Sequence, residues 1–286
     1  MYIKSPLRYP GGKSKAIDSI IPYIPEFKEY REPFIGGGSI YFYIRQKYGD
    51  GKKYWINDLF WELYNFWKYS QYNLNGVINN TIQWKDQYEN GKELFRFLKG
   101  NWYRFNDIEK ASAFFTLNRI TFAGGTLTTG YAEVQYDGFI RSAIKELSDV
   151  GRLLSGTRIT NYDYQKVIEE PGDDVFIYLD PPYYSATSSG LYGKSNRLRN
   201  THKMFDHYRF SRVMRECKHR FLVTYDDSPF VRKQFEWATI IPWELIYGMR
   251  TKNTNVGKEL FITNMDITDK ITTVKTKQFT LEDSWS

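Results

Sequence analysis

The feature that most constrains the fold is an unbroken apolar run over residues 175–179, which ends at Asp180 and two prolines. A short run that is apolar on both faces is typical of a strand buried in a parallel sheet. Parallel strands need long crossover connections, which helices usually supply. We therefore predict an α/β protein in which Asp180 stands at the carboxyl end of a buried strand, where open α/β sheets bind their ligands.

Other strand and helix signals fall into two blocks on either side of a long helical stretch. In the first block, a helix that Ser39 caps runs to Tyr48 and ends at Gly49, between strands expected at residues 30–35 and 54–59. The second block has expected strands at residues 158–162, 175–179, 221–224, 238–243 and 259–263, and helices at 210–218 and 229–235. Together they predict an open, mostly parallel sheet that an insertion interrupts.

The insertion is helical, rich in aromatic residues, and without β-branched runs. We therefore divide the chain into a discontinuous catalytic unit of residues 1–62 and 156–286 and an inserted, mainly helical domain of residues 63–155. Within the insertion, residues 118–126 are rich in glycine and threonine and are expected to form a loop or hairpin that exposes Arg119. Loops of this kind often carry recognition residues.

The charge and composition fit a protein that binds a polyanion, but they do not require that function. The net charge is +7, and aromatic residues, some of which can stack on bases, make up 18% of the chain. No stretch approaches the roughly 18 apolar residues of a membrane span, and the first residues lack the apolar core of a signal peptide. We expect a cytoplasmic protein without a disulfide, because Cys217 is its single cysteine, and without a structural metal.

A glycine-rich turn after the first expected strand predicts a nucleotide-like ligand. Residues 32–39 read Glu-Pro-Phe-Ile-Gly-Gly-Gly-Ser and open directly into a helix N-terminus. Glycines allow close approach of the backbone, and the helix start offers free N–H groups and a positive dipole. Asp58 ends the next strand, 20 residues beyond Gly38, where related folds bind ribose hydroxyls. Such turns also occur as plain tight connections, and the spaced acid favours the binding site.

The tetrapeptide Asp180-Pro181-Pro182-Tyr183 predicts the chemistry. Two prolines fix the backbone and remove two N–H donors, so they hold a rigid arm whose carbonyls face some other donor. An exocyclic amino group is such a donor: Asp180 and the Pro181 carbonyl can each accept one of its hydrogens, while Tyr183 stacks on the ring. The structural alternative is a plain strand terminator with a solvated aspartate.

Two further segments carry positive charge. Residues 7–13 contain a Gly11-Gly12 turn that presents Lys13 beside an aromatic ring, without the spacing of a phosphate-binding loop of ATPases. Residues 190–203 contain no acidic residue and carry four positive charges, on Lys194, Arg197, Arg199 and Lys203. A basic run is often only a solvated surface, but beside a base-binding motif it favours phosphate contacts.

In this order, these motifs resemble the Dam-type family of DNA adenine-N6 methyltransferases, in the α arrangement of cofactor motif, recognition domain and Asp-Pro-Pro-Tyr. The resemblance spans nearly the whole chain, although Tyr9 stands where the family usually has tryptophan, and the family's GATC-reading run is absent, so no target sequence carries over. It implies a Rossmann-like, S-adenosylmethionine-dependent methyltransferase sheet with an inserted, mainly helical target-recognition domain.

The resemblance also implies roles for individual residues. The implied catalytic residues are Asp180, Pro181, Pro182 and Tyr183. The implied cofactor-binding residues are Tyr9, Gly12, Lys13, Pro33, Phe34, Gly36, Gly37, Gly38, Ser39, Asn57, Asp58, Asp163, Tyr164 and Asp180. The DNA-binding residues expected from the insertion, the arm and the basic run are Arg119, Thr126, Tyr184, Lys194, Arg197, Arg199 and Lys203.

The predicted function is therefore site-specific methylation of N6 of an adenine flipped out of double-stranded DNA, with S-adenosylmethionine as methyl donor and no membrane partner. We expect a monomer or weak dimer associated with the nucleoid, with a cognate restriction endonuclease as an optional partner. The alternatives are methylation of cytosine N4, RNA adenine or a protein glutamine, a catalytically silent DNA-binding protein, and a nucleotide-dependent ATPase or kinase.

Overall fold

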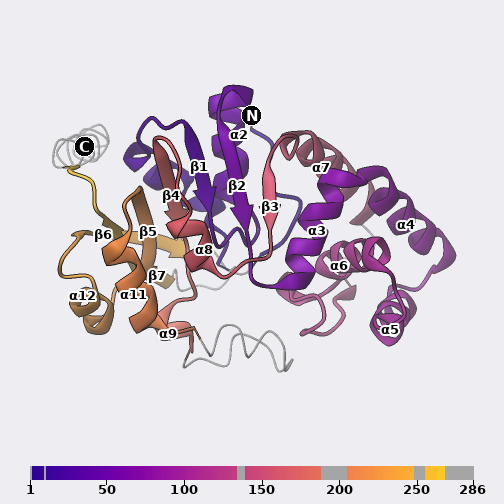
Figure 1. The fold of residues 1–286 in the computed structure, drawn as a ribbon. Coiled ribbons are helices and arrows are strands. Elements are labelled where there is room, and N and C mark those ends of the chain that lie inside the picture. Colours follow the sequence, from indigo (N-terminus) through magenta and orange to yellow (C-terminus); the bar gives the residue numbers. More distant parts are fainter. Residues whose placement is uncertain (1, 10, 134–138, 188–204, 248–254, 268–286) are drawn as a thin grey trace, which may run out of the picture.

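The computed structural model describes the whole chain except residues 1, 10, 134–138, 188–204, 248–254 and 268–286 (Figure 1). A seven-stranded sheet has the order β3-β2-β1-β4-β5-β7-β6. The strands are β1 Glu29–Glu32, β2 Lys53–Asn57, β3 Arg158–Thr160, β4 Val175–Leu179, β5 Arg220–Asp226, β6 Thr239–Tyr247 and β7 Asn255–Thr263. The first five strands in this order pair in parallel, and β7 runs antiparallel to both β5 and β6. This confirms the mostly parallel α/β sheet.

Helices connect the strands, and in the described part of the chain five α-helices lie between β2 and β3. Those five are α3 Trp61–Tyr72, α4 Leu74–Gln87, α5 Gly91–Asn101, α6 Asp107–Ile120 and α7 Phe139–Leu153. The others are α1 Ile17–Ile20, α2 Ser39–Tyr48, α8 Tyr164–Glu169, α9 Tyr184–Thr187, α11 His207–Glu216 and α12 Pro229–Gln234. Short 3-10 helices are η1 Lys13–Lys15, η2 Ile21–Tyr23, η3 Gly49–Gly51 and η4 Phe122–Gly124.

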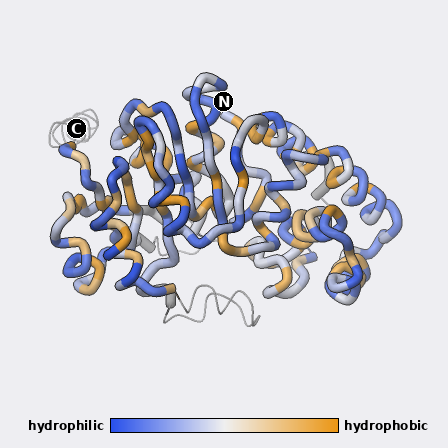
Figure 2. Tube along the Cα trace, in the orientation of Figure 1, coloured by the Kyte–Doolittle hydropathy of each residue, from blue (hydrophilic) through white to orange (hydrophobic). Residues whose placement is uncertain are grey.

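Strand β4 is buried on both faces, as its apolar run predicted. Phe176 and Tyr178 point into a core cluster that includes α1, α2 and the helices after β2. Val175, Ile177 and Leu179 point into a second cluster on the opposite face, formed with α8, α11 and α12. Figure 2 shows hydrophobic stretches along β4 and β5 and a mostly hydrophilic outer helix α4.

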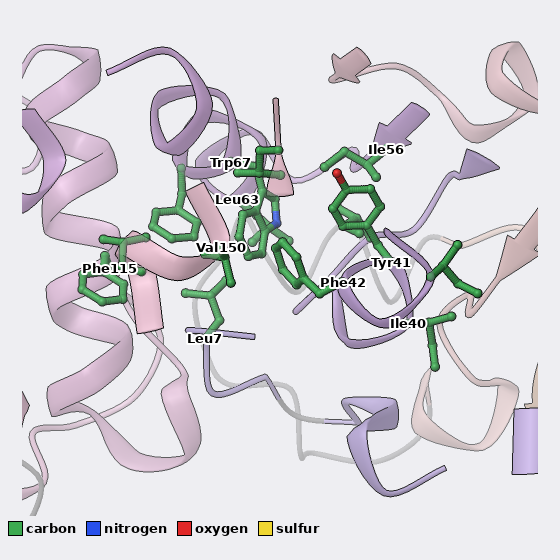
Figure 3. Packing of buried hydrophobic residues seen from close by; sticks show 14 of the residues in the cluster. Leu7, Ile40, Tyr41, Phe42, Ile56, Leu63, Trp67, Phe115 and Val150 are labelled. Carbon is green, nitrogen blue, oxygen red and sulfur yellow. The ribbon is translucent and has the colours of Figure 1, made fainter. Parts of the chain in front are cut away.

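The helices between β2 and β3 share a continuous core with the sheet. Trp67 of α3 packs against Phe42 of α2 with ring centroids 5.4 Å apart, and Leu63 and Val150 lie in the same cluster (Figure 3). Figure 1 shows these helices beside the β3 edge of the sheet. Removing any one of these large side chains would leave a cavity, which typically destabilises a core by several kcal/mol.

Most predicted elements are confirmed, with shifts of a few residues at their ends. One local assignment was wrong: Gly38, with a φ of +73°, is the N-cap of α2, and no side chain caps this helix. Ser39 is instead its first residue. No helix among the described residues is long and apolar enough to cross a membrane.

Candidate active site

Asp180 lies directly after β4, where its carboxylate is held from two sides. The Nζ of Lys13 lies 2.9 Å from Oδ1 of Asp180 and 3.0 Å from Oδ2. The hydroxyl of Thr224, at the end of β5, donates to Oδ1 at 2.8 Å. Lys13 is only 4% exposed and Asp180 22% exposed. The partly buried ion pair and the hydroxyl contact fix the direction of the aspartate oxygens.

The arm that follows Asp180 is fixed by two acidic residues from neighbouring strands. The carboxylate of Asp226, at the end of β5, accepts the backbone N–H groups of Tyr184 at 2.8 Å and Ser185 at 3.1 Å. The hydroxyl of Tyr183 donates to Glu259 of β7 at 2.8 Å. Because the prolines already restrict the backbone, these bonds leave the arm little freedom.

Three residues of this site were not predicted from the sequence: Thr224, Asp226 and Glu259. Asp226 ends β5 and Thr224 lies two residues before it. Both therefore lie near the carboxyl edge of a parallel strand, as Asp180 does, and an apolar run followed by polar residues is a local signal for that position. Glu259 reaches this edge because β7 runs antiparallel and pairs it with Asp226. That register depends on the tertiary fold and has no signal in the local sequence.

The glycine turn of residues 36–38 leaves no room for side chains. Gly36 has a φ of +48°, and a Cβ on Gly37 would lie 2.7 Å from the Cβ of Tyr9. The backbone N–H of Gly36 donates to Oδ2 of Asp58 at 3.1 Å. The carbonyl of Gly36 accepts from the indole of Trp67 at 3.1 Å, so α3 also helps to hold this turn.

Asp58 and Asn57 follow one another at the end of β2 but have different surroundings. Asp58 is half-buried, and desolvation raises the pKa of its carboxyl to about 6 despite hydrogen bonds from Phe60 and Gly36. Asn57 is buried, and its amide donates to the carbonyls of Pro33 and Tyr162, both at 3.0 Å. Asp58 therefore offers a carboxylate at the edge, whereas Asn57 joins the backbones on either side of it.

The aromatic residues near the turn form a packed group. Phe34 contacts Tyr164 with ring centroids 5.4 Å apart and Phe205 at 5.8 Å. Tyr164 is 6% exposed, and burial raises the pKa of its hydroxyl to about 12. Asp163 caps α8 and forms a two-fold ion pair with Arg209, at 3.0 and 2.8 Å, on the wall of an open hollow of about 430 Å³.

Glu32 is a second buried acid on the strand beside β4. It is 3% exposed and accepts a hydrogen bond from the Tyr30 hydroxyl at 2.6 Å. Desolvation raises the pKa of this carboxyl well above its usual range, and the charge of Asp180 raises it further. Burial and the nearby Asp180 carboxylate thus both favour the neutral form of Glu32.

The expected exposure of Arg119 was wrong. Arg119 lies on α6, is 8% exposed, and donates to the Pro6 carbonyl at 3.0 Å and to Glu146 at 3.2 Å. Thr126, also expected to contact DNA, is 4% exposed. Glycine and threonine content indicated a loop, but the helix continues to Ile120 because its residues pack on the core.

The large side chain that this segment does expose is Phe122, which is 62% exposed in η4. A β-bridge between Thr121 and Tyr131 closes the segment behind it. At the end of α6, the Asn118 amide accepts a hydrogen bond from the Arg8 N–H and donates one to the Arg8 carbonyl, both at 2.9 Å. This pair of bonds fixes the chain that leads into Tyr9 and Lys13.

Two other expected DNA contacts have different outcomes. Tyr184 is 39% exposed, and its ring stacks on Phe230 with centroids 4.1 Å apart. The basic residues of the run after the arm lie outside the described residues; they are Lys194, Arg197, Arg199 and Lys203.

Comparison with known proteins identifies the family. The family model described as D12 class N6 adenine-specific DNA methyltransferase matches residues 9–249. The chain belongs to this family. The match contains the glycine turn, the helices α3 to α7 between β2 and β3, and the Asp180–Tyr183 arm, so it covers most of the sheet and the helices beside it. The protein is thus an adenine-specific DNA methyltransferase, and the predicted activity is confirmed.

Curated relatives are similar over much of the chain. A type II methyltransferase, M.MjaIII of Methanocaldococcus jannaschii, is 27% identical over 64% of this chain and 70% of its own length. Type II methyltransferase M1.LlaDCHI of Lactococcus lactis subsp. cremoris is 25% identical over 90% of this chain and 94% of its own. The DNA N-6-adenine-methyltransferase of Escherichia phage P1 is 25% identical over 81% of this chain but only 31% of its own length.

Proposed function

We propose that this enzyme transfers a methyl group from S-adenosylmethionine to N6 of an adenine flipped out of double-stranded DNA. The observation that carries the proposal is the Asp180 carboxylate at the end of β4, oriented by Lys13 and Thr224 and followed by a rigid Pro-Pro-Tyr arm. A flipped base is needed because N6 is not accessible to a protein pocket inside a stacked duplex.

The glycine turn fits the cofactor. Residues 36–38 are glycines, so the turn that leads into α2 has no side chains. The free N–H groups at the start of α2, a helix of ten residues, attract a carboxylate. Asp58 accepts a hydrogen bond from the backbone of the turn, and we propose that its carboxylate also accepts the ribose hydroxyls. When bound, S-adenosylmethionine supplies an electrophilic methyl group on a sulfonium. We propose that Tyr9, Lys13, Phe34 and Asp163 complete this site.

The arm would act on the adenine amino group. Asp180 would accept one N6 hydrogen and the Pro181 carbonyl the other, which draws the nitrogen toward tetrahedral geometry and frees its lone pair. Tyr183 would stack on the base and offset part of the few kcal/mol that flipping costs. Orientation and electrostatics then supply most of the catalysis. A covalent enzyme intermediate is not required, and burial raises the pKa of Cys217 to about 11, which disfavours a nucleophilic thiolate.

The five helices between β2 and β3 would read the DNA. We propose that residues 63–155 act as the recognition unit, while residues 1–62 and 156–286 carry the chemistry. The exposed Phe122 supports this division, because it is the large apolar side chain that the segment after α6 presents to solvent. Basic residues of the run after the arm would contact phosphates. A cognate restriction endonuclease remains a proposed partner.

Replacement of the aspartate tests the proposal. Asp180→Ala removes the acceptor for N6 without altering the glycine turn or Asp58, so methyl transfer to DNA should be lost while cofactor and DNA binding persist. Transfer is measured with labelled S-adenosylmethionine, and binding by titration calorimetry and filter retention. Substantial residual transfer by Asp180→Ala would overturn the assignment. Failure of the wild-type enzyme to bind the cofactor would instead favour a silent DNA-binding protein.

A further inference from the structure

Glu259 is a buried carboxylate at the catalytic edge that the proposed reaction does not use. It is 1% exposed and lies on β7, opposite Asp226 in the antiparallel register. Oε2 of Glu259 accepts the hydroxyl hydrogen of Tyr183 at 2.8 Å. The residue therefore touches the arm at the one ring that would stack on the flipped base.

The Tyr183 ring is held at its edge and along its face. Its plane lies 19° from that of Tyr225, with centroids 6.0 Å apart. The Nζ of Lys13 lies 4.8 Å from the Tyr183 centroid, and the same Nζ contacts Asp180. The ring thus already lies beside a positive charge, which its π face attracts.

A carboxylate acceptor changes the electrostatics of a phenol. When the hydroxyl donates to an anion, electron density shifts into the ring, and its π face becomes a better partner for positive charge. A glutamine at position 259 would accept the same hydrogen bond without the desolvation cost of a buried carboxylate.

We infer that Glu259 is a positioning residue for methyl transfer, which acts through the Tyr183 hydroxyl to fix the ring and to strengthen its attraction for the positive charge that the adenine acquires. This inference rests on the proposed function. In this transfer N6 would form a bond to the methyl carbon while the sulfur–methyl bond of the sulfonium breaks and its electron pair stays on sulfur. The amino group would then be cationic until it releases a proton to water. Glu259 forms no bond to substrate in this step and gains or loses no proton.

A double-mutant cycle tests the inference. Single-turnover rates of N6 methylation are measured for the wild-type enzyme, Glu259→Gln, Tyr183→Phe and the double variant. A lost cation–π contribution of about 1 kcal/mol slows the step by roughly fivefold, so each single variant should fall by that factor. The double variant should be no slower than Tyr183→Phe, because Glu259 acts through the missing hydroxyl.

Binding and stability measurements separate this role from a purely structural one. Affinities for cofactor and DNA should stay within about twofold of wild type, and Glu244→Gln, an exposed residue on β6, should keep the full rate. A wild-type rate for Glu259→Gln overturns the inference, as does an equal loss in the Tyr183→Phe background. If Glu259→Gln does not fold, an unaltered rate for Tyr183→Phe still overturns it. A wild-type enzyme that makes no N6-methyladenine refutes the proposed function instead.

Discussion

The carboxyl edge of the sheet and the helices beside it differ in how their functional residues are placed. At the edge, Asp58, Asp180 and Asp226 each follow or end a parallel strand, and the topology brings them to one side. In the helices, side-chain exposure depends on packing against several partners. Arg119 is buried there and Phe122 is exposed, the reverse of what polarity suggests.

The carboxyl edge of the sheet and the helices between β2 and β3 are separate in sequence but joined in structure. Trp67 of α3 holds the carbonyl of Gly36, and Asn118 of α6 holds the backbone of Arg8. Tyr9 then packs against the glycine turn, and Lys13 pairs with Asp180. The helices are therefore both a candidate DNA-reading surface and a support for the catalytic edge. The following predictions test how strongly the two regions depend on each other.

The largest effect is expected for Lys13→Ala. The substitution removes the cation that orients Asp180 and leaves a partly buried carboxylate without its partner. Transfer should fall by roughly a hundredfold, the loss typical of removing one preorganised electrostatic contact. Single-turnover kinetics measure it, with Lys15→Ala, an exposed lysine of the same 3-10 helix, as the control. Equal rates for both variants would show that the ion pair has no catalytic role.

A smaller but broader effect is expected for Asn118→Leu. The leucine leaves the N–H and carbonyl of Arg8 without their side-chain partner, which costs about 2 kcal/mol of unfolding free energy. Because this segment leads into Tyr9 and Lys13, cofactor affinity should also fall, by about tenfold. Denaturant unfolding and calorimetry measure the two quantities. A stability loss with unchanged cofactor affinity would mean that the helices support the fold and not the cofactor site.

The pKa of Asp58 predicts a pH dependence confined to the edge. Its carboxyl has a pKa of about 6, so at pH 5 only about a tenth is ionised. If only the ionised form binds the ribose, cofactor affinity at pH 5 should be about tenfold weaker than at pH 7.5. Asp58→Asn should bind weakly at both pH values, and a wild-type affinity that is constant over this range would contradict the assignment.

The raised pKa of Asp58 affects the free energy of unfolding in the opposite direction to cofactor affinity. Because folding raises this pKa, the folded state binds more protons than the unfolded state between about pH 4 and pH 6. The stabilisation from the neutral carboxyl is fully present below about pH 4 and is lost as the pH rises through 6. Acid thus weakens cofactor binding at Asp58 while this residue's contribution to stability improves.

The smallest effect is expected for Phe122→Ala. Loss of an exposed ring from the segment after α6 should weaken DNA binding by about threefold to tenfold, the range of modest contacts at an interface. Transfer from saturated complexes should change less than binding, because the ring lies outside the catalytic edge. Tyr103→Ala, which removes another exposed ring from the turn between α5 and α6, is the matched control in a filter-binding titration. Equal losses for both would indicate non-specific contact.

The sequence predicted the edge better than the helices for a physical reason. An apolar run followed by Asp180, or a glycine turn followed by Asp58, is a local signal that parallel topology converts into proximity. Lys13 was found, but its pairing with Asp180 joins residues far apart in the chain and is set by the fold. Glu259 required the register of β7, and Arg119 required the packing of α6 against Pro6 and Glu146.

The most direct test of the central claim is the identity of the methylated nucleoside. The enzyme is incubated with labelled S-adenosylmethionine and, in parallel, with double-stranded DNA, single-stranded DNA or RNA, and each product is digested to nucleosides. We predict that the label appears in N6-methyladenine and that double-stranded DNA is the best substrate. Label in N4-methylcytosine, or methylation of RNA in preference to DNA, would contradict the role assigned to Asp180 and its arm.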